Sequence, residues 1–363
     1  MALLLATPPA AYLVLRLMKA RSAIVEASPI HIILRTRALN RFLEEAPKRH
    51  PRFASVLSQI LLAFFPVLVF LFFLLFGTNL LNLVGRPSEA NQVSLVIPGV
   101  TLGLREMPYV MAALFVGVAF HEFAHGIVGS SKGIPIKSVG VGLFLSLGFA
   151  LVEFDDDGFK KVDRGSRIRA IAAGPSANMV VSAIMILLIS LLSSSASGIV
   201  VLSVTPPASS YLKTWDVITK INGTEMLSDA KFRSYMASVK PGDLLVVQTL
   251  EGIFYVRAGT NPSNSSRGYL GISVTSYIPV LEFMGLKGSY DFVLLLSWIN
   301  LANLSLAVVN VAPIDPLDGG KIIDELLPDN KKPFVRALKL AIFSMTAIIL
   351  VGNFVLSAYR FGL

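Results

Sequence analysis

The sequence predicts a polytopic α-helical membrane protein with about six transmembrane helices, a membrane-associated β-hairpin and a small extracytoplasmic α+β domain. Three observations lead to this fold class. Of the 363 residues, 54% are hydrophobic and only 15% are charged, which is typical of multi-pass membrane proteins. Several apolar stretches are long enough to cross a bilayer as helices. One polar stretch, 195–275, interrupts them and has the length of a small soluble domain.

Charge and cysteine content narrow the possible functions. The net charge of +9 does not indicate a nucleic-acid partner, because much of it lies in short loops beside the predicted spans, where Lys and Arg determine orientation. The chain has no Cys, which excludes disulfides and thiolate metal ligands. Its four His residues are His31, His50, His121 and His125. A metal bound by the last two would therefore take a carboxylate as its third protein ligand.

Residues 1–106 are expected to contain two transmembrane segments separated by a basic cytoplasmic loop. The first segment, 3–18, is apolar but short and carries Pro8-Pro9. The second lies within 55–84 and contains LLAFFPVLVFLFFLLF, which is long enough to span. The densest basic stretch, 16–52, comes between them and is placed in the cytoplasm by the positive-inside rule.

The apolar run 107–129 is the next predicted span, and it carries the motif AFHEFAHG. His121 and His125 are four residues apart, so they share one helix face and can bind one ion. Glu122 adjoins the first of them, where a zinc hydrolase has its general base. Counting from the inner end of the run, His121 lies roughly 12 Å deep at the rise of an α-helix. Because ionisable groups are costly there, we expect a catalytic metal site within the membrane, towards the cytoplasmic side.

A β-hairpin is predicted at residues 133–154, because Gly recurs and β-branched residues alternate within an apolar sequence. Gly140 and Gly142 fall on one face of its first strand, where the missing side chains would let another backbone approach closely. An open sheet edge cannot face lipid, so the hairpin must lie against protein or water. We expect it to offer an edge to a substrate, and a simple buried hairpin is the alternative.

The fourth predicted span, 168–193, completes the first part of the membrane core, 107–194. It begins with AIAAGPSANMVVS, and small residues such as Gly174 allow close contact between helices. Asn178 is a polar residue within the span. We interpret it as a hydrogen-bonding group between helices rather than a catalytic one.

The polar stretch 195–275 is expected to form the extracytoplasmic domain. It contains short alternating strands and one helix-like segment. The order of these elements, and residues 216–223 in particular, resembles a PDZ domain. The loop that usually reads Pro-Gly-Asp departs from that pattern, because residues 213–216 read Lys-Thr-Trp-Asp. A PDZ domain would capture an extended peptide by strand addition.

The C-terminal part supplies candidates for the third metal ligand. Residues 276–327 hold the fifth span, 288–312, and the motif NVAPIDPLDGGK; residues 328–363 hold the last span, 336–358. Asp318 is favoured because the Pro and Gly around it let the backbone depart from a helix at the cytoplasmic side. Two His and a carboxylate, with one open position, form a catalytic zinc set. The other candidates are Glu153, residues 155–157, Asp315 and Asp324.

Several motifs in order resemble one family. They are HEFAH at 121–125, AAGPSAN at 172–178, NVAP at 310–313 and LDG at 317–319. Together they resemble the site-2 protease family of intramembrane zinc metalloproteases, over about 107–320. The PDZ-like insertion before the third core helix is also similar to the family pattern.

The resemblance implies roles for individual residues. Zinc would be bound by His121, His125 and Asp318, with Glu122 as the base. Asn310 would position or polarise the substrate. The hairpin that contains Gly140 and Gly142 would hold the substrate in the membrane.

The resemblance also implies the function: hydrolysis of peptide bonds within transmembrane segments of membrane proteins, in regulated intramembrane proteolysis. The expected partners are transmembrane protein substrates, the lipid bilayer, and a peptide or protein ligand of the PDZ-like domain. The expected location is the cell membrane, with the PDZ-like domain outside the cytoplasm.

Three alternatives stay open at this stage. A membrane metal transporter also places His and carboxylates within spans, but it has no need of Glu122 beside a ligand. A non-catalytic PDZ-bearing adaptor would not need the His-Glu-His set. Another kind of membrane zinc protease takes a downstream Glu as the third ligand, which makes Glu153 the rival of Asp318.

Overall fold

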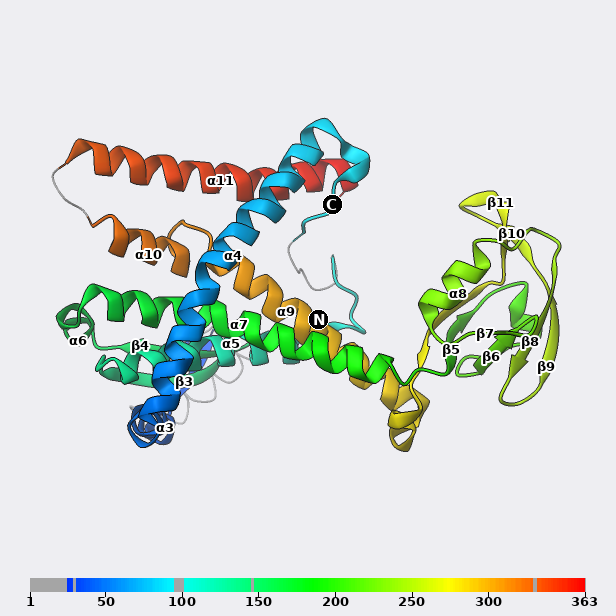
Figure 1. Cartoon of the computed structure of the whole chain (residues 1–363), viewed down its shortest axis with the longest axis horizontal. Helices are drawn as coiled ribbons and strands as arrows, with labels where there is room; N and C mark the ends of the chain where they lie inside the picture. The colour runs from blue at the N-terminus through cyan, green and yellow to red at the C-terminus, as the bar shows by residue number, and fades with distance from the viewer. Residues whose placement is uncertain (1–24, 29–30, 95–100, 145–146, 329–331, 363) are drawn as a thin grey trace. The chain divides into compact units, whose positions relative to one another are not determined.

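The computed structural model describes residues 25–28, 31–94, 101–144, 147–328 and 332–362. The chain divides into two compact units, the first made of Met1–Ile184 with Trp298–Leu363 and the second of Met185–Ser297. The chain enters the second unit within helix α7 and leaves it within helix α9, as can be followed in Figure 1. The predicted segment 3–18 lies outside the described residues.

Five helices in the described part of the chain are long and apolar enough to cross a membrane. They are α4 (Pro51–Gly85), α5 (Met107–Ser131), α7 (Arg164–Ser193), α9 (Gly285–Asn310, preceded by the 3-10 turn Pro279–Met284) and α11 (Pro333–Phe361). Each coincides with one of the spans predicted after residue 54. Most residues of their apolar windows are not buried within the protein, so the helices keep apolar surface for lipid.

A four-stranded antiparallel sheet belongs to the first unit. Its strands are β1 (Val25–Ala27), β2 (His31–Arg35), β3 (Ile136–Phe144) and β4 (Leu147–Phe154), in that spatial order. β3 and β4 are the predicted hairpin. β1 and β2 come from the basic N-terminal stretch, where no strand was predicted. Helix α3 (Arg37–Arg49) follows them, with Thr36 as its N-cap.

The glycine-rich strand β3 is not an edge strand, which corrects one expectation. β2 pairs with it, with Ile33 opposite Gly142 and Arg35 opposite Gly140. A Cβ added at Gly140 would lie 3.1 Å from the Leu34 carbonyl oxygen, and one at Gly142 would overlap a β2 carbonyl. The two glycines therefore accommodate this chain's own β2 and do not face an open substrate edge. The edge strands of the described sheet are β1 and β4.

The second unit is a β-rich fold with one α-helix. Its strands are β5 (Gly198–Val204), β6 (Val217–Ile221), β7 (Thr224–Glu225), β8 (Leu244–Thr249), β9 (Ile253–Arg257), β10 (Gly259–Asn261), β11 (Asn264–Tyr269) and β12 (Ile272–Tyr277), and the helix is α8 (Asp229–Met236). The main sheet has the order β12-β5-β6-β8-β9, with β7 against β6, and β10 pairs with β11. Branched apolar side chains such as Ile199, Ile218 and Val247 are fully buried in its core.

Two short helices lie at the end of the first unit that is predicted to face the cytoplasm. The charged turn predicted at 155–157 is the start of α6 (Asp156–Lys161), where the Asp155 carboxylate accepts the Gly158 backbone N–H at 2.7 Å. Helix α10 (Asp318–Leu326) follows the turn that ends α9. A Cβ at Gly319 would overlap the Val311 and Ala312 carbonyl oxygens, so only Gly lets α10 begin this close to the end of α9.

Candidate metal centre and active site

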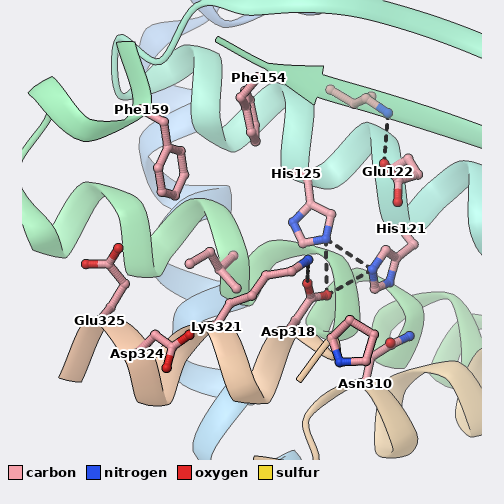
Figure 2. A pocket seen from close by; sticks show the side chains of 13 residues that line it. His121, Glu122, His125, Phe154, Phe159, Asn310, Asp318, Lys321, Asp324 and Glu325 are labelled. Atoms are coloured by element: carbon pink, nitrogen blue, oxygen red, sulfur yellow. Dashed lines mark hydrogen bonds and ion pairs between the residues drawn. The ribbon is translucent and has the colours of Figure 1, made fainter. Parts of the chain in front are cut away.

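Three side chains from two distant parts of the sequence converge in the first unit. His121 and His125 project from one face of α5, and Asp318 is the first residue of α10. The Asp318 Oδ2 atom lies 3.0 Å from His121 Nε2 and 3.2 Å from His125 Nε2, and the two Nε2 atoms are 3.0 Å apart. Figure 2 shows the three side chains turned towards one another. All three are buried, except for a small part of each imidazole.

This group fits a zinc ion. Two imidazole nitrogens and one carboxylate oxygen are the ligand types of a catalytic zinc site. Ligand atoms about 2.0–2.2 Å from a tetrahedral zinc lie roughly 3.3 Å from one another, close to the separations seen here. The Asp318 Oδ2 atom is buried and has no hydrogen-bond donor among the described residues. A buried carboxylate oxygen that faces two imidazole nitrogens is well suited to a cation.

Helix α7 makes room for the two imidazoles. The side of α7 that faces them carries Gly174, and a Cβ there would lie 2.7 Å from His121 Nε2 and even closer to His125. His125 is oriented by the same helix, because its Nδ1 lies 2.7 Å from the Ala170 carbonyl oxygen. Nδ1 must carry the proton in that hydrogen bond, which leaves Nε2 free to bind a metal.

Glu122 points to the sheet edge beside the metal group. Its Oε2 accepts the backbone N–H of Val152 at 2.8 Å. Val152 lies opposite Val139 in the hairpin. Both backbone groups of Val139 bond away from β4, since its N–H donates to Asn40 and its C=O accepts from Thr36. Val139 and Val152 are therefore a non-hydrogen-bonded pair of the antiparallel ladder. In such a pair the N–H and C=O of Val152 also face away from β3.

The second oxygen of the Asp318 carboxylate is held separately. Lys321 Nζ donates to Asp318 Oδ1 at 2.8 Å, so Oδ2 alone faces the imidazoles (Figure 2). Helix α10 is tied to the start of α7 by a two-point ion pair. Arg167 Nε lies 2.9 Å from Glu325 Oε1, and Arg167 Nη2 lies 2.8 Å from Glu325 Oε2. Such a planar, two-point ion pair fixes the orientation of α10 relative to α7 as well as the distance between them.

A cavity of about 520 Å³ opens onto the metal group. Its wall includes Glu122, Val152 and Phe154 on one side and Asn310, the last residue of α9, on another. Figure 2 shows Asn310 beside Asp318, within the same hollow. The remaining lining residues are His121, His125, Phe159, Ile171, Pro316, Asp318, Lys321, Asp324 and Glu325. The cavity thus joins the candidate ligands, base and amide predicted from the sequence.

The rival ligand Glu153 lies outside this group. Its carboxylate accepts hydrogen bonds from Lys137, Ser138 and Arg35 at 2.5, 2.9 and 3.2 Å. The hydrogen bonds from Lys137 and Ser138 lower the pKa of Glu153, and its carboxylate forms ion pairs with Lys137 and Arg35. Among the described His, Asp and Glu residues, the group that could hold a metal is His121, His125 and Asp318.

Some site residues were not predicted. Gly174 was noted for helix packing, but its clearance for the imidazoles depends on how α5 and α7 cross. Lys321 directly follows the LDGG motif, and its spacing of three from Asp318 on a helix would have been a usable signal. The bond from Val152 to Glu122 is made by the backbone and leaves no mark in the side-chain pattern. Gly140 and Gly142 are absent from the cavity wall.

Comparison with known families agrees with this geometry. A family model described as peptidase family M50 matches residues 109–352, well over half of the chain. The chain belongs to the M50 family. This is the site-2 protease family of metallopeptidases, and the five membrane-length helices agree with a multi-pass membrane protein. M50 membership supports a membrane metalloprotease over the transporter and adaptor alternatives.

The sequence identity to one curated relative can also be stated. An uncharacterized protein of Methanocaldococcus jannaschii is 31% identical over 227 residues, which is 61% of this chain and 59% of the relative. The chain thus matches somewhat more than half of that relative's length.

Proposed function

We propose that this M50 protein is a zinc endopeptidase that cleaves peptide bonds within transmembrane segments of membrane proteins, as in regulated intramembrane proteolysis. The observation that carries the proposal is the buried His121, His125 and Asp318 group on a membrane-length helix, with Glu122 on the wall of the same cavity. A metal transporter would have no use for a carboxylate placed beside the ligands but outside the ligand group.

The residues divide the chemistry between them. A zinc ion bound by the three ligands would polarise the scissile carbonyl and lower the pKa of a water molecule. Glu122 takes the proton from the attacking water and passes it to the leaving amine. Asn310 lines the same cavity, and its amide N–H donates to the carbonyl oxygen of the substrate. Lys321 keeps Asp318 turned with a single oxygen towards the ion.

Three variants test the assignment in the full-length protein. Glu122→Gln should retain stoichiometric zinc and lose cleavage of a model transmembrane substrate, because it removes the base but no ligand. Asp318→Ala should lose both zinc and cleavage. Glu153→Ala should keep both, because its partners are Lys137, Ser138 and Arg35.

Zinc content by atomic emission and cleavage by gel assay give the two readouts. Zinc retained in Asp318→Ala but lost in Glu153→Ala would move the third ligand to Glu153. Full cleavage by Glu122→Gln would remove Glu122 as the base. An absence of zinc in the parent protein would overturn the zinc assignment as a whole.

We also propose that the substrate segment is held as a strand along the outer edge of β4. β4 is an edge strand of its sheet and reaches the cavity wall at Val152, whose C=O faces away from β3 while its N–H donates to Glu122. A helical substrate hides its carbonyls in its own hydrogen bonds, so it must unwind before attack. Pairing with a strand edge would hold it extended.

A proline scan of the substrate tests this edge without altering the protease. Only alternate residues of an added strand hydrogen-bond to β4, and Pro removes a backbone donor. Cleavage should therefore fall at every second substrate position near the scissile bond. A smooth dependence on position, as expected if Pro acted only by loosening the substrate helix, would contradict strand pairing.

For the second unit we propose a PDZ-like role in peptide capture. Strand β12 ends the main sheet, and a cavity of about 290 Å³ is lined by α8 and by residues of β11 and β12, including Phe232, Met236 and Ile272. A peptide strand added to β12 would place a side chain in that cavity. Peptide arrays probed with the full-length protein should lose their signal in Met236→Glu, and an unchanged signal would exclude this groove.

The proposed topology has this second unit outside the cell and the metal centre towards the cytoplasm. Since the chain has no native Cys, single cysteines report without interference. Asn222→Cys should react with an impermeant maleimide applied outside intact cells, and Arg49→Cys should not. The reverse labelling pattern would invert the orientation.

A further inference from the structure

The two metal-binding imidazoles differ in how their far nitrogen is held. His125 Nδ1 is fixed by the Ala170 carbonyl at 2.7 Å. His121 Nδ1 is equally buried but has no hydrogen-bond partner among the described residues. A histidine that binds metal through Nε2 carries its proton on Nδ1, and that N–H normally meets a carboxylate, a carbonyl or a water. His121 therefore needs a partner that the metal group itself does not provide.

Asn178 of α7 is a buried residue with unused hydrogen-bonding capacity. It is fully buried, and neither its Nδ2 nor its Oδ1 has a partner in the described part of the chain. Asn303 of α9 is also fully buried; its Nδ2 donates to the Ile299 carbonyl at 2.8 Å, but its Oδ1 has no described partner. Each such group costs about 1–3 kcal/mol if nothing satisfies it, and few persist in native proteins.

The helix packing brings these groups to one level. Ser182 of α7 donates to Asn300 of α9 at 2.6 Å, and further along both helices Ile171 and Asn310 line the metal cavity. The two helices thus run in opposite directions. Asn178 on α7 and Asn303 on α9 are each about one turn closer to the cavity than the Ser182–Asn300 hydrogen bond, so they lie at the same level along the two helices.

Helix α5 adds His121 to this level. Asn303 packs against α5 at Gly117, where a Cβ would lie 3.6 Å from Asn303 Nδ2. Gly117 is one turn from His121 on the same helix face. On α7, Asn178 is one turn from Gly174, which faces the imidazoles. His121, Asn178 and Asn303 therefore lie within about one turn of the same level on three packed helices, on the side of the metal group away from Asp318 and Lys321.

We propose that Asn178 is a positioning residue for His121. With Asn303 it binds a buried water that accepts the Nδ1–H of His121 and donates to the Oδ1 atoms of the two amides. Three hydrogen bonds are the usual number for a buried water. The arrangement fixes the tautomer and the plane of the His121 ring, as Ala170 does for His125. The inference rests on zinc binding at the site proposed above.

The test is zinc affinity by chelator competition in the full-length protein. Asn178→Leu should bind zinc about 10–100-fold more weakly, which is the usual effect of losing the group that orients a metal-binding His. Asn178→Asp keeps an acceptor oxygen and should restore most of the affinity. The absorption spectrum of the cobalt-substituted protein should change in Asn178→Leu, because the geometry at the metal changes.

Ser176→Ala is the matched control. Ser176 is also fully buried on α7 with an unpartnered side-chain oxygen, so this variant removes a buried polar atom away from His121. Its zinc affinity should stay within about twofold of the parent value. If Asn178→Leu does not fold, Asn178→Ala and Asn303→Leu are judged by the same criterion.

Two results would overturn different claims. Parental zinc affinity and cobalt spectrum in Asn178→Leu would make Asn178 a packing residue only, and would leave the proposed protease intact. Equal losses in Asn178→Leu and Ser176→Ala would attribute the effect to α7 packing. Failure of the parent protein to bind zinc would instead remove the proposed zinc site.

Discussion

Around the metal group, helices α5, α7 and α10 meet through glycines and buried polar side chains, whereas the second unit is filled by branched apolar ones. Gly174 and Gly319 have no space for a Cβ, and His121, Asn178 and Asp318 are buried beside them. The core of the second unit consists of residues such as Ile218 and Val247. Metal binding in the first unit should depend on the positions of a few atoms, whereas the stability of the second unit should depend on how fully its core is packed. Mutations should therefore affect metal binding in the first unit and folding stability in the second.

The largest expected effect, complete loss of the bound metal, is that of Gly174→Ala. The added methyl would overlap the imidazoles of His121 and His125, and overpacking of this kind forces side chains out of place. We expect loss of stoichiometric zinc with the helices still formed. Zinc content and circular dichroism of the purified protein measure the two properties. Gly77→Ala on α4 is the control, since nothing lies within 4 Å of the added Cβ; normal zinc in both variants would refute the clearance role.

Next in size is Ile218→Ala in the second unit. Ile218 is fully buried in the apolar core, and truncation of such a side chain costs about 2–5 kcal/mol. Limited proteolysis in urea should cut residues 198–277 at lower urea concentration than in the parent. The zinc content of the same preparation should not change. A parallel loss of zinc would mean that the two interiors are energetically coupled and do not fail independently.

A smaller effect is expected for Glu325→Gln. The variant keeps the shape but weakens the two-point pair with Arg167 that ties α10 to α7. Hydrogen bonds to charged groups contribute about 1.5–3 kcal/mol. Only part of this loss should appear as weaker metal binding, because Glu325 acts on Asp318 indirectly, through the position of α10. We expect zinc affinity to fall roughly 3–10-fold, measured by chelator competition. No change would show that the turn at Gly319 positions α10 without this pair.

The smallest effect is expected for Glu225→Gln. The side chains of the Lys220–Glu225 pair on β6 and β7 are 42% and 60% exposed, and the pair spans 3.6 Å. Exposed pairs of this kind contribute about 0–1 kcal/mol. The urea midpoint of proteolysis should match the parent within error. A shift as large as that of Ile218→Ala would mean that surface charge, and not packing, stabilises the second unit.

Features encoded by local spacing were predictable from the sequence. The His121, Glu122 and His125 pattern fixes its own geometry once the segment is a helix, and α5 is a helix throughout. The five described spans follow from apolar length alone. Asp318 was favoured over Glu153 by its Pro and Gly neighbours, and the structure brings Asp318 to the imidazoles.

Features that depend on distant partners were not predictable in the same way. The pairing of β2 with β3 joins segments about a hundred residues apart, and nothing in residues 31–35 specifies that partner. Gly140 and Gly142 were correctly recognised as permitting close backbone approach, but the approaching strand is internal. The clearance at Gly174 and the bond from Val152 to Glu122 arise only when α5, α7 and β4 pack together.

The place of Asp318 in the chain also affects biosynthesis. His121 and His125 leave the ribosome long before Asp318, because α7 and the whole second unit lie between them in the sequence. At about 5–20 residues per second, this interval lasts roughly 10–40 s. Throughout that time a nascent chain would hold the proposed base and two of the proposed ligands but lack the third. Under the proposed function, the order of the chain alone would keep a partly synthesised protein from hydrolysing peptide bonds, without any inhibitory segment.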